Sequence, residues 1–403
     1  MEFKTLPALM PQREINRLLS FLEYYFASIG RSSFSQEGDC EIITIIEGES
    51  RVTRSEWEAA LAKVVDANPA CRLRIVGRRQ NARWSSDGVG TRIRHIESCA
   101  WDGRSHIGAE FIKATHLDLE NGPTSELIIA KGEPDRIMIR AHHAVMDGMG
   151  IVYFFQELFR ALRGEPLLGT NAIFSDADLM QSVAAQRPPK LEGKPASLTG
   201  GVRRAQRGNV WRRISATGVK PNYLLGKLAV WIKQFAERYS NLPVRIMLPV
   251  NLRRHCDGLN SMLNFTGIVI VEVSSTDGAD EFRRKLRDLL KINAEANYSP
   301  TIEKFRYLPM AWLDWVGAKF ARHENTKDTV GVSNFGVVKP EHYRCENFSP
   351  RAMFALPAFD GNAFIVIAIM NNTAEISVGM PLGLASDGRF DALMNYLGEQ
   401  LQQ

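Results

Sequence analysis

The chain has 403 residues, of which 45% are apolar, and its formal net charge at pH 7 is +5. This size and apolar content allow a large buried core, and the length favours two lobes over one. The five cysteines are scattered, which excludes a disulfide framework and a cysteine-based metal knuckle, so a reducing cytoplasm is the expected environment. The longest apolar stretches, such as Ala363–Met370, are strand-sized, and the amino end lacks the apolar core of a secretory signal. We therefore expect a cytoplasmic protein without a membrane span.

In the first half of the chain, the apolar residues from Ile15 to Phe26 recur at helical spacing and predict an amphipathic helix. Asp135–Arg140 reads as a buried strand, and the apolar positions from Ile151 to Leu162 predict a second helix. Prolines, glycines and polar residues then interrupt the pattern, which is typical of a linker. We expect an amino-terminal lobe over 1–170, a crossover linker over 171–216 and a carboxy-terminal lobe over 217–403.

In the second half, helices and strands alternate and the end of the chain is rich in strands. The expected helices span about 223–239, 280–297 and 301–322, and the expected strands span about 244–248, 267–273, 364–370 and 375–378. Asn371-Asn372-Thr373 predicts a hairpin between the last two strands. Asp387 is expected to cap a closing helix.

The most informative segment is His142-His143-Ala144-Val145-Met146-Asp147-Gly148, which directly follows the strand expected over 135–140. A strand end can present polar side chains at a cleft. Successive side chains of an extended segment point to opposite faces, so the two histidines cannot converge on one centre. This argues against a metal site, and we expect none. One imidazole acting as a general base remains, because its ordinary pKa lies near neutrality.

Each residue of this segment also has a purely structural interpretation. The histidines could be hydrogen-bonded at a strand end without chemistry, and Asp147 could simply cap the helix that begins near Met149. The four fixed positions together are rare in a chain of this composition, and the combination favours a functional interpretation.

The segment resembles the His-His-x-x-x-Asp-Gly motif of acyltransferases that use a coenzyme A or carrier-protein thioester. This superfamily includes chloramphenicol acetyltransferase, peptide-synthetase condensation domains, plant BAHD enzymes and bacterial alcohol acyltransferases. The chain resembles bacterial alcohol acyltransferases and condensation-like proteins more closely than the plant enzymes. Further segments similar to the family's lie at 43–48, 57–61, 68–74, 117–123, 248–253, 264–267 and 333–336.

The resemblance implies an α/β (α+β) fold of two chloramphenicol-acetyltransferase-like lobes, which form a V-shaped pseudo-dimer around a central channel. The pantetheine arm of the donor would enter one mouth of the channel and the acceptor the other. His143 would be the general base, and Asp147 would pair with Arg253 to hold the loop. His142 is expected to orient the loop, and Gly148 would allow close approach of the backbone.

Ser333 and Asn334 are weaker candidates for contacts to the oxyanion or the acceptor, because a Ser-Asn pair before Phe-Gly is also typical of a turn.

The expected linker is basic. Its arginines gather around Trp211 and are Arg203, Arg204, Arg207, Arg212 and Arg213. The first three are candidates for binding the phosphates of coenzyme A or the acidic face of an acyl carrier protein. A solvated crossover segment explains the same charges. Nothing else in the sequence supports nucleic-acid binding.

These observations lead us to expect a monomeric acyltransferase that moves an acyl group from a coenzyme A or phosphopantetheine-linked thioester to a hydroxyl or amine of a small molecule. Because a thioester is already activated, no covalent acyl-enzyme and no permanently bound cofactor are required. The alternative is a non-catalytic condensation-like domain that binds a carrier-protein intermediate as a scaffold or gate. Stand-alone condensation-like enzymes commonly serve secondary metabolism, and by analogy we expect the same of this protein.

Overall fold

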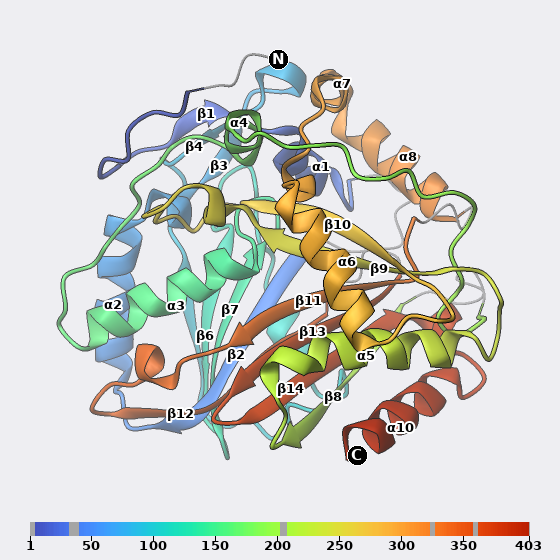
Figure 1. Ribbon diagram of the computed structural model, residues 1–403. Coiled ribbons are helices and arrows are strands. Elements are labelled where there is room, and N and C mark those ends of the chain that lie inside the picture. The colour runs from blue at the N-terminus through green and yellow to red at the C-terminus, as the bar shows by residue number, and fades with distance from the viewer. Residues whose placement is uncertain (1–4, 32–39, 202–207, 323–326, 358–361, 403) are drawn as a thin grey trace.

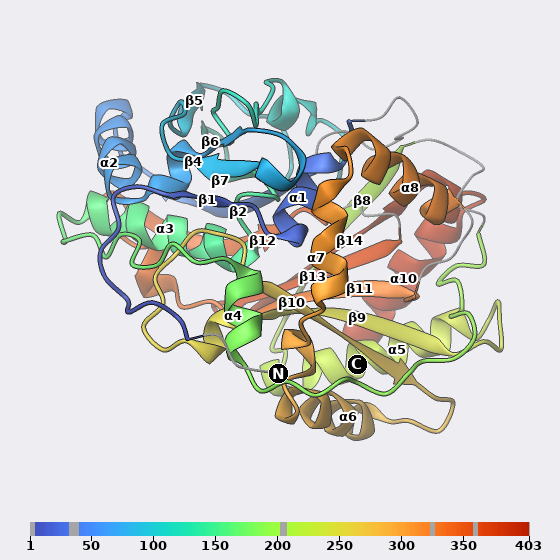
Figure 2. The same cartoon turned by 90° about the horizontal axis from the view of Figure 1, so that it is seen from above.

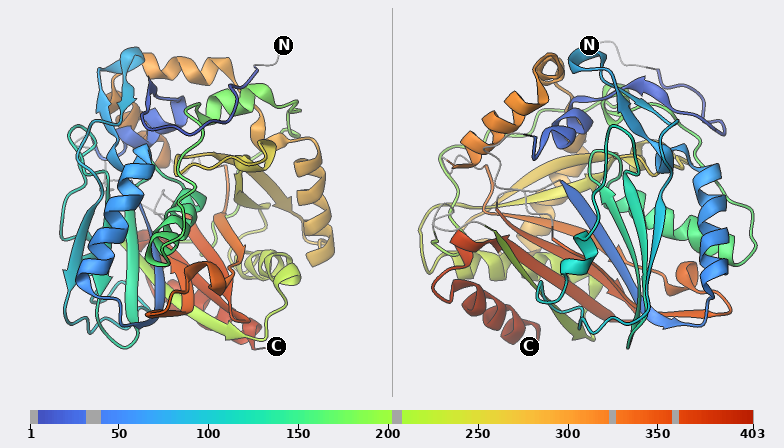
Figure 3. Two further views of the ribbon diagram at one scale, coloured as in Figure 1. Left: turned by 90° about the vertical axis from the view of Figure 1, so that its left-hand side faces the viewer. Right: turned by 180° about the vertical axis from the view of Figure 1, so that it is seen from behind.

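The computed structural model describes residues 5–31, 40–201, 208–322, 327–357 and 362–402, which form two lobes that lie side by side (Figures 1 and 3). A five-stranded sheet of order β12-β2-β7-β6-β5 forms the first lobe, and a six-stranded sheet of order β10-β9-β11-β13-β14-β8 forms the second. A small sheet, β1-β4-β3, lies beside the first. The expected two-lobe α/β architecture is confirmed.

The first lobe packs two helices on one face of its sheet, and the buried rings of Trp57, Phe154 and Phe159 fill this core. Its strands are β1 (Asn16–Leu18), β2 (Glu41–Ser50), β3 (Arg74–Val76), β4 (Arg83–Ser85), β5 (Arg92–Ile96), β6 (Ser125–Ala130) and β7 (Asp135–His142), joined by β12 (Phe348–Ala355). Its covering helices are α2 (Arg54–Ala67) and α3 (Gly148–Leu162).

The second lobe has its own core between its sheet and the helices that cover it, of which α5 and α6 lie below the sheet in Figure 2. Its strands are β8 (Asn209–Thr217), β9 (Val244–Asn251), β10 (Thr266–Val273), β11 (Val330–Val337), β13 (Ala363–Met370) and β14 (Thr373–Pro381). The covering helices are α5 (Pro221–Ala236), α6 (Ala279–Lys291) and α10 (Arg389–Leu401), with the short α9 (Leu382–Ala385) before the last.

Further helices lie between the lobes and at the periphery. These are α1 (Phe21–Ser28), α4 (Asp176–Ser182), α7 (Pro300–Glu303) and α8 (Met310–Arg322). The 3₁₀ turns are η1 (Pro69–Arg72), η2 (Arg79–Asn81), η3 (Glu110–Lys113), η4 (Leu252–His255), η5 (Ala294–Ala296), η6 (Lys304–Tyr307) and η7 (Pro340–Tyr343). None of the helices in the described ranges has the length and apolar character needed to cross a bilayer.

The helix expected from Ile15 begins later than the periodicity indicated. Residues 16–18 form strand β1, which pairs with β4, and α1 starts only after Ser20. The Ser20 hydroxyl accepts a hydrogen bond from the Glu23 backbone N–H, and the Glu23 carboxylate accepts one from the Ser20 N–H. This capping box fixes the start of the helix, which apolar spacing alone does not locate.

The expected linker over 171–216 contains helix α4 and most of strand β8. Strand β8 pairs antiparallel with β14 along its whole length, from Asn209 opposite Pro381 to Thr217 opposite Thr373. Strand β12 comes from the second half of the chain but pairs with β2 of the first sheet. The domain limits at 170 and 217 therefore stay a prediction, and strand pairing crosses them at these two places.

The hairpin expected at Asn371 is confirmed, because β13 and β14 pair antiparallel on either side of it. Asn371 and Asn372 both adopt positive φ angles, 51° and 60°, which asparagine tolerates better than most residues. The expected cap at Asp387 is wrong. Gly388 occupies the N-cap position of α10, and the Asp387 carboxylate instead pairs with Arg389.

A buried ion network joins the two sheets away from the motif. Glu47 on β2 accepts hydrogen bonds from Arg136 Nε at 2.9 Å and from both terminal nitrogens of Arg213 at 3.0 Å. Arg213 belongs to β8 of the other sheet, and its Nε lies 3.5 Å from the Glu375 carboxylate. We call these four residues the Glu47 network. It holds the lobes together through charges that have almost no contact with solvent.

Candidate active site

The histidine motif forms the loop between strand β7, which ends at His142, and helix α3, which begins at Gly148. Asp147 is the N-cap of that helix, and its carboxylate accepts a hydrogen bond from the Gly150 N–H at 2.5 Å. At the strand end, the His143 N–H donates to the Cys40 carbonyl at 2.7 Å. The capping interpretation of Asp147 is therefore correct, and further contacts show what else this carboxylate does.

His142 is turned into the protein and is 2% exposed. Its Nδ1 accepts a hydrogen bond from the Ala144 N–H at 3.2 Å, so Nδ1 carries no proton. Burial, with a smaller effect of the neighbouring His143, lowers the pKa of His142 to about 3. The ring is thus held neutral and braces the loop.

His143 lies on the opposite side and lines a cavity between the lobes. Its ring stacks on Phe26 of α1, with centroids 4.3 Å apart and planes inclined by 13°. Nδ1 lies 3.2 Å from the Met146 carbonyl oxygen, which can only accept, so Nδ1 carries the proton of the neutral ring. Nε2 is then the nitrogen that can accept a proton.

The pKa of His143 is lowered by burial, and the nearby Asp147 charge and hydrogen bonds offset only part of this effect. The imidazole is therefore neutral at pH 7.

Asn264, fully buried in the second lobe, holds the His143 backbone. Its Nδ2 donates to the His143 carbonyl at 2.9 Å and lies 3.3 Å from Nδ1 of the ring. Because Nδ1 already carries a proton, the amide nitrogen can donate only to the carbonyl. The second lobe thereby fixes the position of a residue supplied by the first.

Asp147 forms the second tie between the lobes, and the ion pair expected with Arg253 is present at 2.9 Å. The same carboxylate oxygen accepts the Phe265 N–H at 2.7 Å and the Thr266 hydroxyl at 3.1 Å. Burial alone would raise the pKa of Asp147, but the Arg253 charge and these hydrogen bonds outweigh burial and lower it. The carboxylate is ionised and faces away from the cavity.

The cavity next to His143 has a volume of about 230 Å³ and draws its walls from both lobes. Most of its lining is apolar and comes from α1, β2, β9, β10, β11, β12 and β13. Gly148 also lines it, and a Cβ atom at this position would lie 2.9 Å from the Phe335 ring, so the expected close approach is real. Thr44, Asn209, Thr266 and Ser333 add polar groups. Such a space suits a largely apolar ligand with a few polar atoms.

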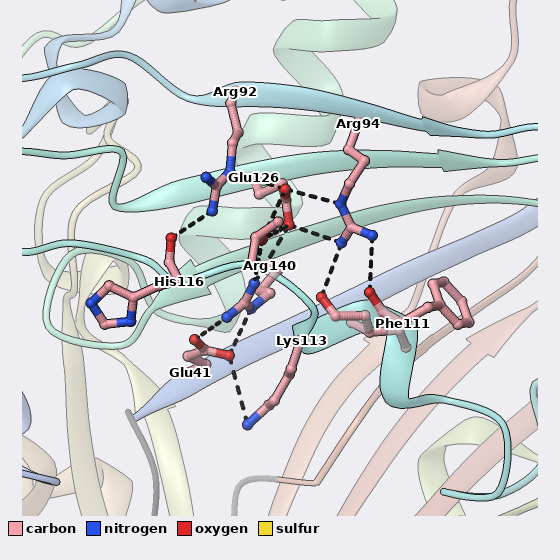
Figure 4. Close-up of polar contacts among 10 residues, drawn as sticks. Glu41, Arg92, Arg94, Phe111, Lys113, His116, Glu126 and Arg140 are labelled. Atoms are coloured by element: carbon pink, nitrogen blue, oxygen red, sulfur yellow. Dashed lines mark hydrogen bonds and ion pairs between the residues drawn. The ribbon is translucent and has the colours of Figure 1, made fainter.

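Charged side chains line the cavity where strand β2 begins (Figure 4). Glu41 receives two hydrogen bonds from Arg140, at 2.7 and 2.5 Å, and Lys113 Nζ lies 3.6 Å from the same carboxylate. Behind it, Arg140 reaches Glu126, whose carboxylate also binds Arg94 at 3.0 Å. Glu41 is therefore held as part of the wall and is not free to act as a base.

The two weaker candidates from the sequence, Ser333 and Asn334, take different positions relative to the cavity. Ser333 lines the cavity, whereas Asn334 is exposed and its side-chain oxygen accepts the Gly336 N–H at 2.9 Å. The alternation of β11 turns these neighbours to opposite faces. Asn334 thus makes the turn considered above, and its assignment to the oxyanion or the acceptor stays a prediction.

The basic cluster of the expected linker does not form a free patch in its described part. Arg203, Arg204 and Arg207 lie outside the described residues. Arg212 pairs with Asp391 at 2.6 Å, and Arg213 belongs to the buried Glu47 network.

Sequence reasoning missed the roles of Phe26, Glu41 and Lys113 at the site. Their contacts depend on how α1, β2 and η3 approach the motif from separate parts of the chain, and no local pattern marks them. In the described ranges, no three His, Cys, Asp or Glu side chains are grouped so that they could hold a metal ion.

The sequence matches no family model and no curated protein, so the similarity is one of structure. The condensation domain from the Monacolin K polyketide synthase MokA has a TM-score of 0.66 and 12% identity, covering 96% of each chain. A mutant starter condensation domain of rhizomide synthetase RzmA, in complex with C8-CoA and Leu-SNAC, has a TM-score of 0.64 and 12% identity over 96% of this chain and 95% of that one. The epimerization domain from the third module of tyrocidine synthetase B has a TM-score of 0.59 and 13% identity over 98% and 97%. These structural likenesses establish a condensation-domain-like fold. At identities this low they establish nothing finer.

Proposed function

We propose that this protein is an acyltransferase that moves an acyl group from a coenzyme A or carrier-protein thioester to a hydroxyl or amine acceptor. The observation that carries the proposal is the neutral imidazole of His143, with a defined tautomer, in the wall of a mostly apolar cavity between two lobes. The likeness to a condensation domain solved with C8-CoA and Leu-SNAC supports the same class of reaction.

In the proposed reaction, Nε2 of His143 takes the proton of the acceptor as its oxygen or nitrogen attacks the thioester carbonyl. A tetrahedral oxyanion forms, and its collapse breaks the carbon–sulfur bond. The departing thiolate takes the proton from the imidazolium, which restores the neutral ring. No bond forms between the acyl group and the protein, and no cofactor takes part.

The other motif residues support the base without touching substrate. Asp147 and Arg253 hold the loop against the second lobe, and His142 braces it from within. Ser333 is the proposed donor to the oxyanion, because its side chain lines the cavity beside Gly148. Arg203, Arg204 and Arg207 stay candidates for the donor phosphates.

Substitution of the base tests the proposal directly. In His143→Ala, thiol release from an acyl thioester in the presence of hydroxyl and amine acceptors should fall about 10²- to 10⁴-fold. The wild-type rate should stay constant as pH falls below 6.5, the ordinary pKa of histidine. It should decline only as pH falls through the lowered pKa of His143. His342→Ala, on an exposed histidine outside the cavity, is the matched control.

The alternative of a non-catalytic scaffold or gate predicts the same fold without turnover. Unchanged thiol release in His143→Ala would remove the catalytic assignment. Absence of acceptor-dependent release in the wild type, together with binding of an acylated carrier protein, would favour the scaffold.

A further inference from the structure

We propose that the outward surface of α7, η6 and α8 docks the protein on a lipid bilayer with anionic headgroups. This segment lies at the edge of the molecule, outside α1 (Figures 1 and 3). It exposes four large apolar side chains within eleven residues: Ile302 at 46%, Phe305 at 43%, Tyr307 at 55% and Trp312 at 44%. We call these four residues the α7–α8 patch.

The charges of the segment are sorted between its two sides. From 300 to 319, its acidic residues are Glu303 and Asp314, and both point inward. Glu303 accepts the Phe21 N–H at 3.3 Å, and Asp314, which is 5% exposed, accepts the Gly30 N–H at 3.3 Å. The exposed charges of this stretch are Lys304 and Lys319, which make no ion pair within the described ranges. Within 300–319, the exposed charged side chains are thus all cationic, and they lie beside exposed apolar and aromatic side chains.

This combination identifies the occupant. Aromatic side chains with flanking lysines match the interface of a bilayer, where rings lie among headgroups and lysines contact anionic lipids. Lys319 extends over the Trp315 ring at 5.1 Å, beside Trp312, so the aromatic and cationic groups form one surface. A second copy of the chain fits less well, because a symmetric contact between identical patches would bring these lysines together without a carboxylate.

The α7–α8 patch is also connected to the wall of the cavity through packed aromatic rings. Ring contacts lead inward from Phe305 to Phe21 at 6.0 Å, then through Tyr25 to Phe26 at 5.9 Å and on to His143. Tyr24 fixes α1 to the segment by donating to the Leu308 carbonyl at 2.7 Å. Docking would place the cavity beside a store of apolar substrate, a consequence that rests on the proposed acyl transfer, whereas docking itself does not.

Vesicle co-sedimentation of the full chain tests the proposal without any turnover. The wild type should bind vesicles of phosphatidylcholine with phosphatidylserine. It should bind far less strongly to vesicles of phosphatidylcholine alone. Lys304→Glu with Lys319→Glu should weaken binding by at least about 20-fold, since each lysine near an anionic surface contributes about fivefold. Lys63→Glu with Lys227→Glu, on exposed lysines elsewhere, is the matched control.

The apolar half of the surface has its own variant. Ile302→Ser with Trp312→Ser should abolish binding, while Ile107→Ser with Val337→Ser removes two exposed apolar side chains elsewhere and should not. Trp312→Phe keeps an aromatic ring and should retain most of the wild-type affinity. An unfolding midpoint of the patch variants equal to that of the wild type excludes misfolding. Equal binding of patch and control variants, or no binding to phosphatidylserine vesicles, overturns the proposal. Self-association or acyl-carrier-protein binding that the patch variants abolish, without vesicle binding, also overturns it.

Discussion

Two buried ion networks join the lobes, and they are built differently. Asp147 is a single carboxylate that receives hydrogen bonds from Arg253, Gly150, Phe265 and Thr266. The Glu47 network contains two carboxylates and two arginines, and the pKa of Glu375 is raised because burial outweighs the attraction of Arg213. The pKa of Asp147 is lowered instead.

The position of each network explains what it can influence. Asp147 lies in the same loop as His143, four residues away, so its contacts with the second lobe determine where the imidazole is held. Glu47 lies on β2, between strands β12 and β7 of the first sheet, and does not line the cavity. One network therefore couples lobe docking to the site, and the other holds the lobes together.

Asp147→Ala should have the largest effect, because it harms both stability and rate. Loss of the carboxylate leaves Arg253 buried without its partner, at a cost of about 3 to 5 kcal/mol in the free energy of unfolding. Displacement of the His143 loop should lower the transfer rate about 100-fold in the protein that remains folded. Denaturant unfolding and thiol-release kinetics measure the two effects, with the exposed Asp66→Ala as control.

Glu47→Ala should separate stability from rate. It leaves Arg136 and Arg213 buried without their shared carboxylate and should cost about 3 to 5 kcal/mol in the free energy of unfolding. The transfer rate below the unfolding transition should stay within about twofold of wild type, since Glu47 does not line the cavity and the contacts of Asp147 that hold the His143 loop remain. A loss of rate as large as that of Asp147→Ala would show that the Glu47 network also positions the site.

Glu375→Gln should have the smallest effect, and its size should depend on pH. A carboxyl group whose folded pKa is raised stabilises the fold fully below its unfolded value, near 4.5, and loses this contribution as pH rises through the folded pKa. The variant should therefore gain stability relative to wild type as pH increases above 4.5. Unfolding free energies measured at several pH values test this. A difference independent of pH would contradict the raised pKa.

The sequence was most informative where the determinants are local. The segment His142–Gly148 predicted a strand end, a loop and a helix start, because strand alternation and the Asp147 cap act within a few residues. The hairpin at Asn371 followed from turn chemistry in the same way. The capping box at Ser20 is also local, but helical spacing before it extended the prediction too far.

Contacts between distant segments were beyond sequence patterns. Prolines, glycines and polar residues predict a linker over 171–216, and only the pairing with β14 shows that residues 209–217 form a strand of the second sheet. Asn334 could not be separated from Ser333 until β11 fixed which face each side chain takes. Local sequence also does not show that strand β12 joins the first sheet, because its place and register depend on the partner strand β2.

The amino-acid sequence by itself determined the chemistry available to this protein: a histidine at a strand end, an acidic helix cap beside it and an arginine far along the chain. Tertiary structure decided which of the two imidazoles meets the cavity, which tautomer it holds and which side chains close around it. The physical reason is that periodicity and capping act over one or two turns of chain, whereas the ring of Phe26, the amide of Asn264 and the guanidinium of Arg253 reach the loop only after the lobes have packed.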